Sequence, residues 1–221
     1  MSFTLDEAIA LADSAHRGAV DTGRPRGGDR QRAVRRLVQA AGYGPAHQVT
    51  AVLHEDDEGS GLGPDLLARA RLRGAPPEVV AALDSVTRRP DPDAPDDWEP
   101  YLSGLIRRAA ANDIGRVVKL FDGVVSMLPW HAEGPAGDLR SQIEYRYRPA
   151  QAILLAAEAA RRDEGLVGPF PVERGAFLRW AIALDTRVRA NDRFGALSAR
   201  LEALGHDDGL STALGEGYAA S

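Results

Sequence analysis

Apolar residues in this chain recur three and four positions apart, and this spacing constrains the fold more than any other feature of the sequence. The first apolar stripe follows a Thr4-x-x-Glu7 capping box and ends at Gly18, which is typical of one amphipathic helix. No segment alternates apolar and polar residues with the period of two that a half-buried strand shows. We therefore predict an all-α fold, a helical bundle. Its further helices are expected around 29–41, 45–58, 64–73, 77–89, 96–106, 114–125 and 141–162.

The chain is long enough for one core of ordinary size, because it has 221 residues of which 44% are hydrophobic. Residues 163–175 are rich in glycine and proline and are typical of a linker. Apolar residues between 177 and 204 indicate one or two more helices. We predict one domain over 1–162 and, over 163–221, a linker with a C-terminal helical extension that packs on the core.

Charge and composition exclude several classes of protein. The net charge of −5 gives no electrostatic reason to bind bulk nucleic acid or an anionic membrane. There are no cysteines, so disulfides and thiolate metal sites are ruled out. Because the sequence shows neither an 18-residue apolar run nor a secretory leader, we expect a cytoplasmic protein.

The apolar run at residues 49–53 is followed by a histidine and four consecutive acids, His54-Glu55-Asp56-Asp57-Glu58. Imidazole and carboxylate groups gathered in this way are typical of a cation site. The predicted helix carries this run, so His54 and Glu55 lie in its last turns and Glu58 one turn further along, and the three can share one face. We therefore expect potential ligands and an acid/base group to lie together there.

A second concentration of charge precedes this run. From Arg17 to Arg36 there are seven arginines against two aspartates, in a chain that is acidic as a whole. This asymmetry indicates a phosphate-bearing ligand. The alternative is a solvated basic surface in which Asp29 only caps a helix, since capping alone would select aspartate there.

The segment Leu53-His54-Glu55-x-x-Glu58 resembles the L-H-D-x-x-E-D core of HD-domain metal phosphohydrolases, and is closest to RelA/SpoT-type guanosine polyphosphate hydrolases. Three more segments resemble the same family. Residues 76–89 are similar to its "ppeVv.aVdaLTr" segment, 110–122 to its "aaNplAr.VKLaDl.dN" segment and 145–149 to its closing "eRYlpal" segment. The resemblance extends to about residue 160 and implies an HD-like helical domain.

The resemblance also implies a site for one divalent ion, Mn²⁺ or Mg²⁺, and for a phosphorylated small molecule or nucleotide. Its positions carry over to this chain as metal ligands Asp29, His54, Glu55 and Asp122, catalytic Glu58, and ligand-binding Arg24, Arg26, Arg88 and Ser126. Asp122 lies on a strongly apolar stretch, where an acid is rarely buried without a partner. The alternative is that it points to solvent.

The sequence departs from the family pattern at positions that bear on chemistry. Asp29 stands in place of a histidine, Glu55 in place of an aspartate, Gly59 in place of an acid and Ser126 in place of an asparagine. Loss of one acid/base partner typically costs about 10²- to 10⁴-fold in rate. We expect a divergent domain that binds a divalent metal or a phosphorylated nucleotide with weak or lost hydrolysis. The alternative is an active Mn- or Mg-dependent phosphohydrolase acting on a nucleotide or another phosphorylated metabolite.

Both functions require the helices that carry these residues to meet. We expect the second and third helices and the helix of Asp122 to converge on one cavity, with Asp122 within roughly 6 Å of His54.

Overall fold

The computed structural model of the protein describes residues 3–18, 28–55, 62–88, 101–126, 142 and 146–160. Within these ranges the regular structure is helical and includes no strand, which confirms the all-α prediction. No helix among them is long and apolar enough to cross a membrane. The predicted linker and extension at 163–221 lie outside the described residues and stay a prediction.

Five helices make up the first half of the described chain: α1 (Leu5–Gly18), α2 (Asp29–Ala40), α3 (Pro45–Leu53), α4 (Leu62–Leu72) and α5 (Pro77–Val86). The predicted capping box opens α1. The Thr4 backbone N–H donates to Glu7 Oε2 at 2.7 Å, and the Glu7 N–H donates to Thr4 Oγ1 at 3.2 Å. Both bonds satisfy backbone groups that have no partner within the helix, so this helix start is determined locally.

The second half contains the π-helical turn η1 (Tyr101–Ile106) and the helices α7 (Arg107–Ala111), α8 (Asp113–Ser126) and α10 (Arg148–Ala160). Asn112 separates α7 from α8. Its side-chain Oδ1 accepts hydrogen bonds from the backbone N–H groups of Ile114 and Gly115, at 3.1 and 2.8 Å. Asn112 thereby starts α8 independently of α7.

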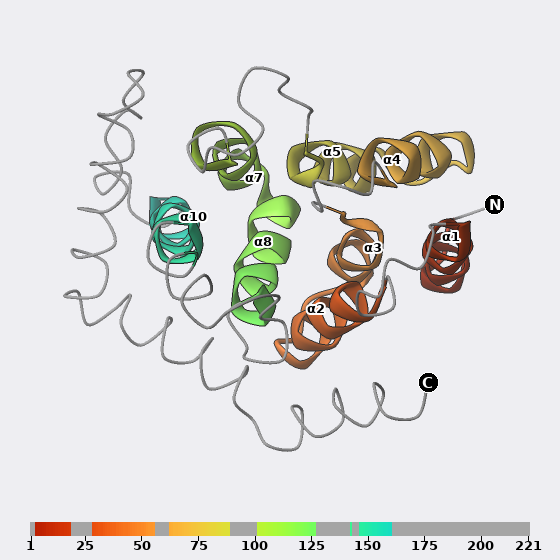
Figure 1. Ribbon diagram of the computed structural model, residues 1–221, viewed down its shortest axis with the longest axis horizontal. Coiled ribbons are helices and arrows are strands. Elements are labelled where there is room, and N and C mark those ends of the chain that lie inside the picture. The colour runs from red at the N-terminus through yellow and green to blue at the C-terminus, as the bar shows by residue number, and fades with distance from the viewer. Residues whose placement is uncertain are drawn as a thin grey trace.

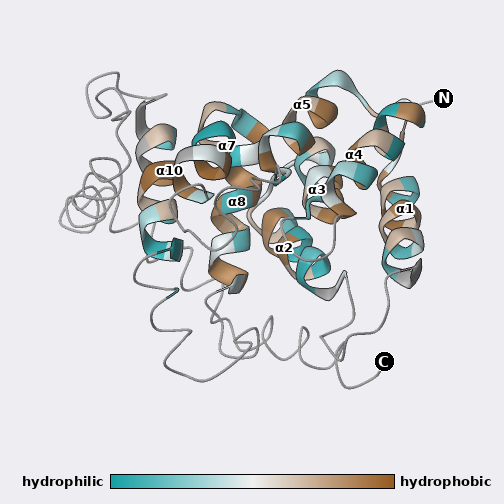
Figure 2. Ribbon diagram, turned by 45° about the horizontal axis from the view of Figure 1, so that its top comes forward, coloured by the Kyte–Doolittle hydropathy of each residue, from teal (hydrophilic) through white to brown (hydrophobic). Residues whose placement is uncertain are grey.

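Helix α8 lies at the centre of the described structure (Figure 1), in contact with α2, α3, α5, α7 and α10. Helix α10 packs on one side of α8, whereas α2 and α3 lie on the other, and α1 packs on α3 beyond them. Hydrophobic and hydrophilic residues alternate around the helix ribbons (Figure 2), as in amphipathic helices that share a core. Helix α8 is therefore surrounded by other helices, and its polar side chains lie in the interior.

Every residue of α8 from Gly115 to Ser126 is buried, including three charged ones. Arg116 donates from Nε to Glu158 Oε2 of α10 at 2.8 Å, and from Nη1 to the Ala110 carbonyl oxygen of α7 at 2.9 Å. These bonds tie three helices together. The other two charged residues, Lys119 and Asp122, pair with each other, and Asp122 also contacts Arg30 of α2. They define the candidate site.

Several predicted helix boundaries are wrong, among them the end of α5, which lies at Val86 and not at residue 89. Helix α3 does not continue to residue 58, because it ends at Leu53 and His54 takes an extended backbone conformation with φ −69° and ψ 139°. The N-cap of α2 is Gly28 and not Asp29, which is the first residue of the helix. Gly28 has φ 104°, in the left-handed region that glycine adopts without a steric penalty.

Candidate functional site

Helices α2, α3 and α8 meet at the carboxylate of Asp122, which is only 1% exposed. Arg30 of α2 donates to Asp122 Oδ1 from Nε at 2.8 Å, and its Nη2 lies 2.7 Å from the same oxygen. Lys119, one helical turn before Asp122 on α8, donates from Nζ to Oδ2 at 2.5 Å. Two cationic side chains thus share one buried carboxylate, and we call these three residues and His54 the Asp122 cluster.

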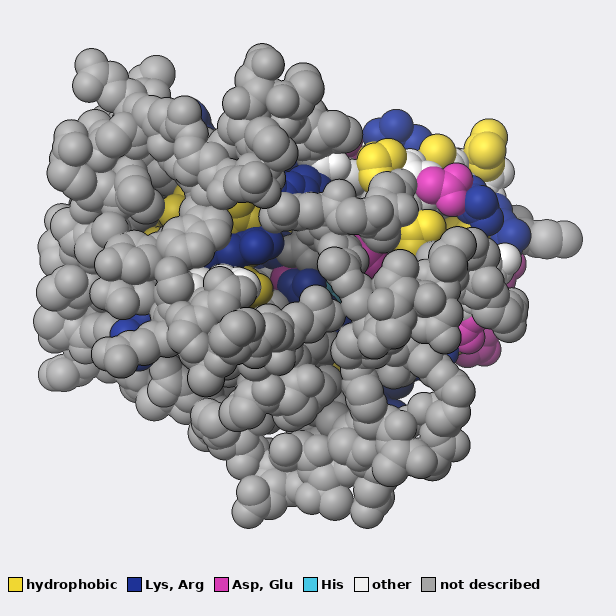
Figure 3. Space-filling view, viewed as in Figure 1, with side chains coloured by type: hydrophobic (Ala, Val, Ile, Leu, Met, Phe, Trp, Pro, Cys, Tyr) yellow, Lys and Arg dark blue, Asp and Glu magenta, His cyan; other side chains and the backbone are white. Residues whose placement is uncertain are grey.

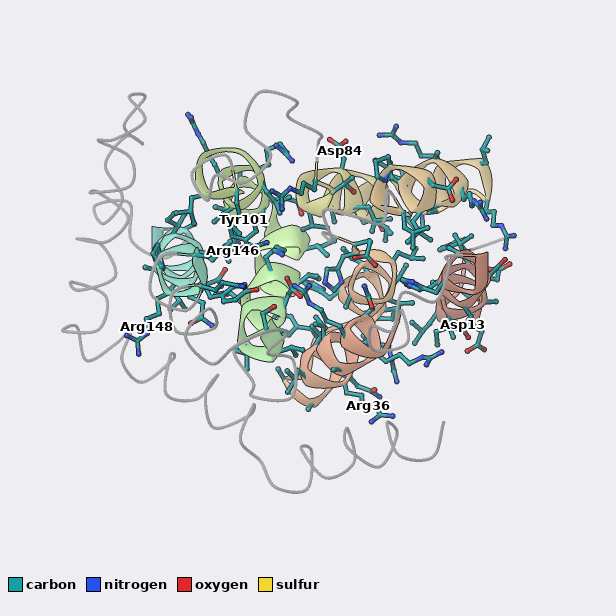
Figure 4. The ribbon with its side chains drawn as sticks, viewed as in Figure 1. Asp13, Arg36, Asp84, Tyr101, Arg146 and Arg148 are labelled. Atoms are coloured by element: carbon teal, nitrogen blue, oxygen red, sulfur yellow. The ribbon has the colours of Figure 1, made fainter. Side chains whose placement is uncertain are left out.

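His54, just after the end of α3, completes the cluster. Its Nδ1 lies 2.7 Å from the Ala51 carbonyl oxygen, and its Nε2 lies 3.2 Å from Asp122 Oδ1. The distance confirms the predicted meeting of His54 with Asp122, and burial of Asp122 excludes the solvent-facing alternative. Nitrogen and oxygen atoms gather between α8 and the α2–α3 pair in Figure 4.

The hydrogen bond to Ala51 determines that Nδ1 of the His54 ring carries a proton. A backbone carbonyl oxygen can only accept, so Nδ1 must donate and, in the neutral ring, Nε2 is left with a lone pair. Buried Nε2 makes no hydrogen bond to any described residue. Nε2 lies 3.2 Å from Asp122 Oδ1, so a neutral ring places this lone pair against the carboxylate, whereas a protonated ring points an N–H at it and so favours the ionised carboxylate.

The charge of Asp122 is set by two opposing effects. Burial raises the pKa of the Asp122 carboxyl, but the nearby Arg30, Lys119 and His54 overcome it and hold this pKa well below its ordinary value. The carboxylate is therefore ionised in the folded protein at neutral pH.

This lowered pKa predicts how stability changes in acid. A carboxyl whose folded-state pKa is lower than its unfolded value of 3.8 stabilises the fold fully above that pH and loses the contribution as pH falls further. The stability difference between wild type and Asp122→Asn should therefore shrink below about pH 3.8, at up to about 1.4 kcal/mol per pH unit. Urea unfolding of both proteins between pH 7 and pH 2 measures it. A difference that stays constant over that range would contradict the assignment.

Glu55 does not join the Asp122 cluster. Its Oε2 accepts a hydrogen bond from Gln31 Nε2 at 2.8 Å and lies 3.8 Å from His16 Nε2 of α1. Because the backbone is extended at His54, successive side chains point in opposite directions. The expectation that His54 and Glu55 share one helical face is therefore wrong: they contact different helices.

Of the remaining predicted site residues, three lie within the described ranges and three lie outside them. Ser126 is buried, and its Oγ donates to the Asp122 backbone carbonyl oxygen at 2.8 Å, one turn back along α8. Arg88 follows the end of α5 and is half-buried. Asp29 precedes Arg30 at the start of α2. Arg24, Arg26 and Glu58 lie outside the described residues, so their roles stay predictions.

The described residues do not fit a Mn²⁺ or Mg²⁺ ion in this arrangement. Within the described ranges, no group of three or more histidines and acids lies close enough together to hold a metal ion. Both oxygens of Asp122 accept bonds from protein cations, and Glu55 is turned toward Gln31. The predicted ligand set as a whole, which includes the Asp29 side chain, stays a prediction.

Sequence reasoning missed Arg30 and Lys119 as members of the site. The signal for Lys119 is visible in retrospect, because a lysine three residues before an aspartate on an apolar helix can pair with it. Arg30 carried no comparable signal, since it is one of seven arginines between residues 17 and 36 and lies 92 positions from Asp122.

Comparison of the chain with protein-family models, with curated proteins and with solved structures gave no match.

Proposed function

We propose that this protein is a divergent HD-type domain that binds a phosphorylated small molecule or nucleotide, such as a guanosine polyphosphate, and hydrolyses it weakly or not at all. The resemblance supplies the ligand class. The observation that carries the loss of hydrolysis is the pair of protein cations, Arg30 and Lys119, on the carboxylate of Asp122.

Metal-dependent hydrolysis needs an ion with an open position for water or substrate. Here the carboxylate that would hold the ion already accepts bonds from two cations. At an effective dielectric constant near 20, unit charges 4 Å apart interact by about 4 kcal/mol. Repulsion from Arg30 and Lys119 therefore offsets the attraction that one carboxylate offers to a divalent ion, and catalysis through such an ion is disfavoured.

The same cations favour an anionic ligand. Arg30 is 25% exposed and so reaches toward solvent, and arginine matches phosphate through paired N–H donors. Lys and Arg side chains come into view near the middle of the face shown in Figure 3. The predicted phosphate-binding residues Arg24 and Arg26 precede α2 in the sequence, a few positions before Arg30.

Binding can be tested with guanosine tetraphosphate in a calorimetric titration with EDTA present. Wild type is expected to bind, and Arg24→Ala and Arg26→Ala should each weaken binding about 10- to 100-fold, because a hydrogen bond to a charged group contributes about 1.5–3 kcal/mol. Arg71→Ala, which removes an exposed arginine of α4, is the matched control and should bind as wild type does. Equal affinity in all four proteins would show that Arg24 and Arg26 belong to a solvated surface and do not bind the ligand.

Hydrolysis is followed with the same proteins after EDTA has been removed, by chromatography of the nucleotide after addition of Mn²⁺. Little or no product is expected from wild type. Efficient turnover that EDTA abolishes would instead support the second function, an active Mn- or Mg-dependent phosphohydrolase acting on a nucleotide or another phosphorylated metabolite.

One observation favours that second function. Metal-binding histidines commonly donate their other ring N–H to a backbone carbonyl or carboxylate. His54 donates to Ala51 in this way, and its Nε2 faces Asp122. The Asp122 cluster therefore retains one feature of a metal site, although its cations oppose an ion.

A further inference from the structure

We propose that Arg30 and Lys119 take the place of a divalent ion at Asp122, and that Arg30 keeps such an ion out. The inference deepens the proposed loss of hydrolysis, which rests on the same two cations, and it is tested by metal binding alone, independently of nucleotide binding. The buried Asp122 carboxylate and the buried His54 imidazole lie as close together as two ligands of one metal ion. The described residues around them nevertheless do not fit a metal ion, and the proposal accounts for both observations.

The first support is where the positive charges lie. Arg30 Nε and Nη2 both lie within 2.8 Å of Asp122 Oδ1, the oxygen that faces His54 Nε2 at 3.2 Å. An ion bound by His54 and Asp122 together would have to use that oxygen. The guanidinium group therefore competes with the ion for the same ligand atom, and its charge repels the ion at close range.

The second support is the burial of Lys119. It is 1% exposed and, being three residues before Asp122 on α8, reaches Oδ2 of the carboxylate from the same helix. Its Nζ also lies 5.6 Å from the centre of the Tyr101 ring. The guanidinium of Arg146 lies 4.4 Å from that ring, and Tyr101 and Arg146 are seen side by side beside α8 in Figure 4. Lys119 is thus built into the core, with its Nζ held between the Asp122 carboxylate and the Tyr101 ring.

The two cationic side chains differ in how accessible they are. Lys119 is enclosed by α8 and the elements packed on it, whereas Arg30 enters from α2 and is 25% exposed. Loss of the Arg30 side chain would leave Oδ1 and His54 Nε2 facing one another without the guanidinium. Arg30 is therefore the group whose removal should let a metal ion in.

The experiment uses the full-length protein, stripped with EDTA, and Mn²⁺ as the only probe. Wild type, Arg30→Ala, Arg30→Gln and the control Arg32→Ala are compared by titration calorimetry and by thermal unfolding. Arg32 also lies on α2 but pairs with Asp13 of α1 at 2.6 Å, away from Asp122. Wild type and Arg32→Ala should show no saturable Mn²⁺ binding and no change in Tm. Arg30→Ala should gain one saturable Mn²⁺ site, with a rise in Tm of several degrees at saturation.

The site is located by adding His54→Gln to Arg30→Ala, which should remove the gained binding. If Arg30→Ala unfolds in EDTA, Mn²⁺ should restore its helical circular dichroism. Arg30→Gln keeps a hydrogen-bond donor near Asp122 without the charge and is expected to fold and to bind Mn²⁺ more tightly than wild type. Stoichiometric Mn²⁺ binding by wild type, or no gain in either Arg30 variant, would overturn the proposal.

Discussion

Replacing Asp122 with alanine is expected to lower the free energy of unfolding by about 3–5 kcal/mol, because it leaves a buried ammonium group without its carboxylate. Lys119 is 1% exposed and donates to Asp122 Oδ2. Arg30, at 25% exposure, can turn toward solvent more readily, so most of the loss should come from Lys119. Urea unfolding at pH 7 measures the change.

A double variant separates this charge effect from a loss of packing. Asp122→Leu combined with Lys119→Met replaces both buried charges with apolar groups, and should recover most of the stability that Asp122→Ala loses. Lys119→Met alone should cost less than Asp122→Ala, because Asp122 keeps its bonds to Arg30. A loss below about 1 kcal/mol for Asp122→Ala would show that the pairing in the Asp122 cluster contributes little.

Gly115→Ala is expected to destabilise the protein by about 1–3 kcal/mol, although alanine is the better helix former. A Cβ on Gly115 would overlap Ser85 Oγ of α5 and would lie 3.2 Å from Val86 Cγ1. The glycine is thus required by the close approach of α5 and α8. Thermal and urea unfolding of the variant measure the cost.

Gly123→Ala, on the same helix, is the matched control. A Cβ there meets only Gln151, at an ordinary contact distance of 3.4 Å, so this variant should keep or gain up to about 1 kcal/mol. Ser85→Ala in the Gly115→Ala background removes the overlapping oxygen and should restore part of the loss. If the two glycine variants are equally stable, the close approach of α5 and α8 does not require a glycine at position 115.

The helices themselves follow from local sequence. The Thr4 and Glu7 pair starts α1 through bonds within four residues, and Pro45 lies at the start of α3 as predicted. The apolar stripes around 33–38 and 117–125 are buried as their spacing predicts. The closeness of His54 and Asp122 was expected from the family resemblance, which matched both positions.

The directions of the acidic side chains were not predictable in the same way. Whether His54 and Glu55 share a face depends on where α3 ends, and helix ends vary by one or two residues with their tertiary surroundings. A Cβ on Gly63 would lie 2.7 Å from the Glu55 carbonyl oxygen, so α4 packs closely against the backbone that follows the end of α3. One residue of extended backbone at His54 then sends Glu55 toward α1.

The sequence alone determined that the described part of the chain is helical and that a buried aspartate on α8 would require partners, because periodicity and the cost of burying charge act on neighbouring residues. Only the tertiary structure decided which partners these are. Arg30 and Asp122 are 92 positions apart, and nothing local distinguishes Arg30 from the other arginines near it. Their pairing arises from the packing of α2 against α8, which places one particular guanidinium at the carboxylate.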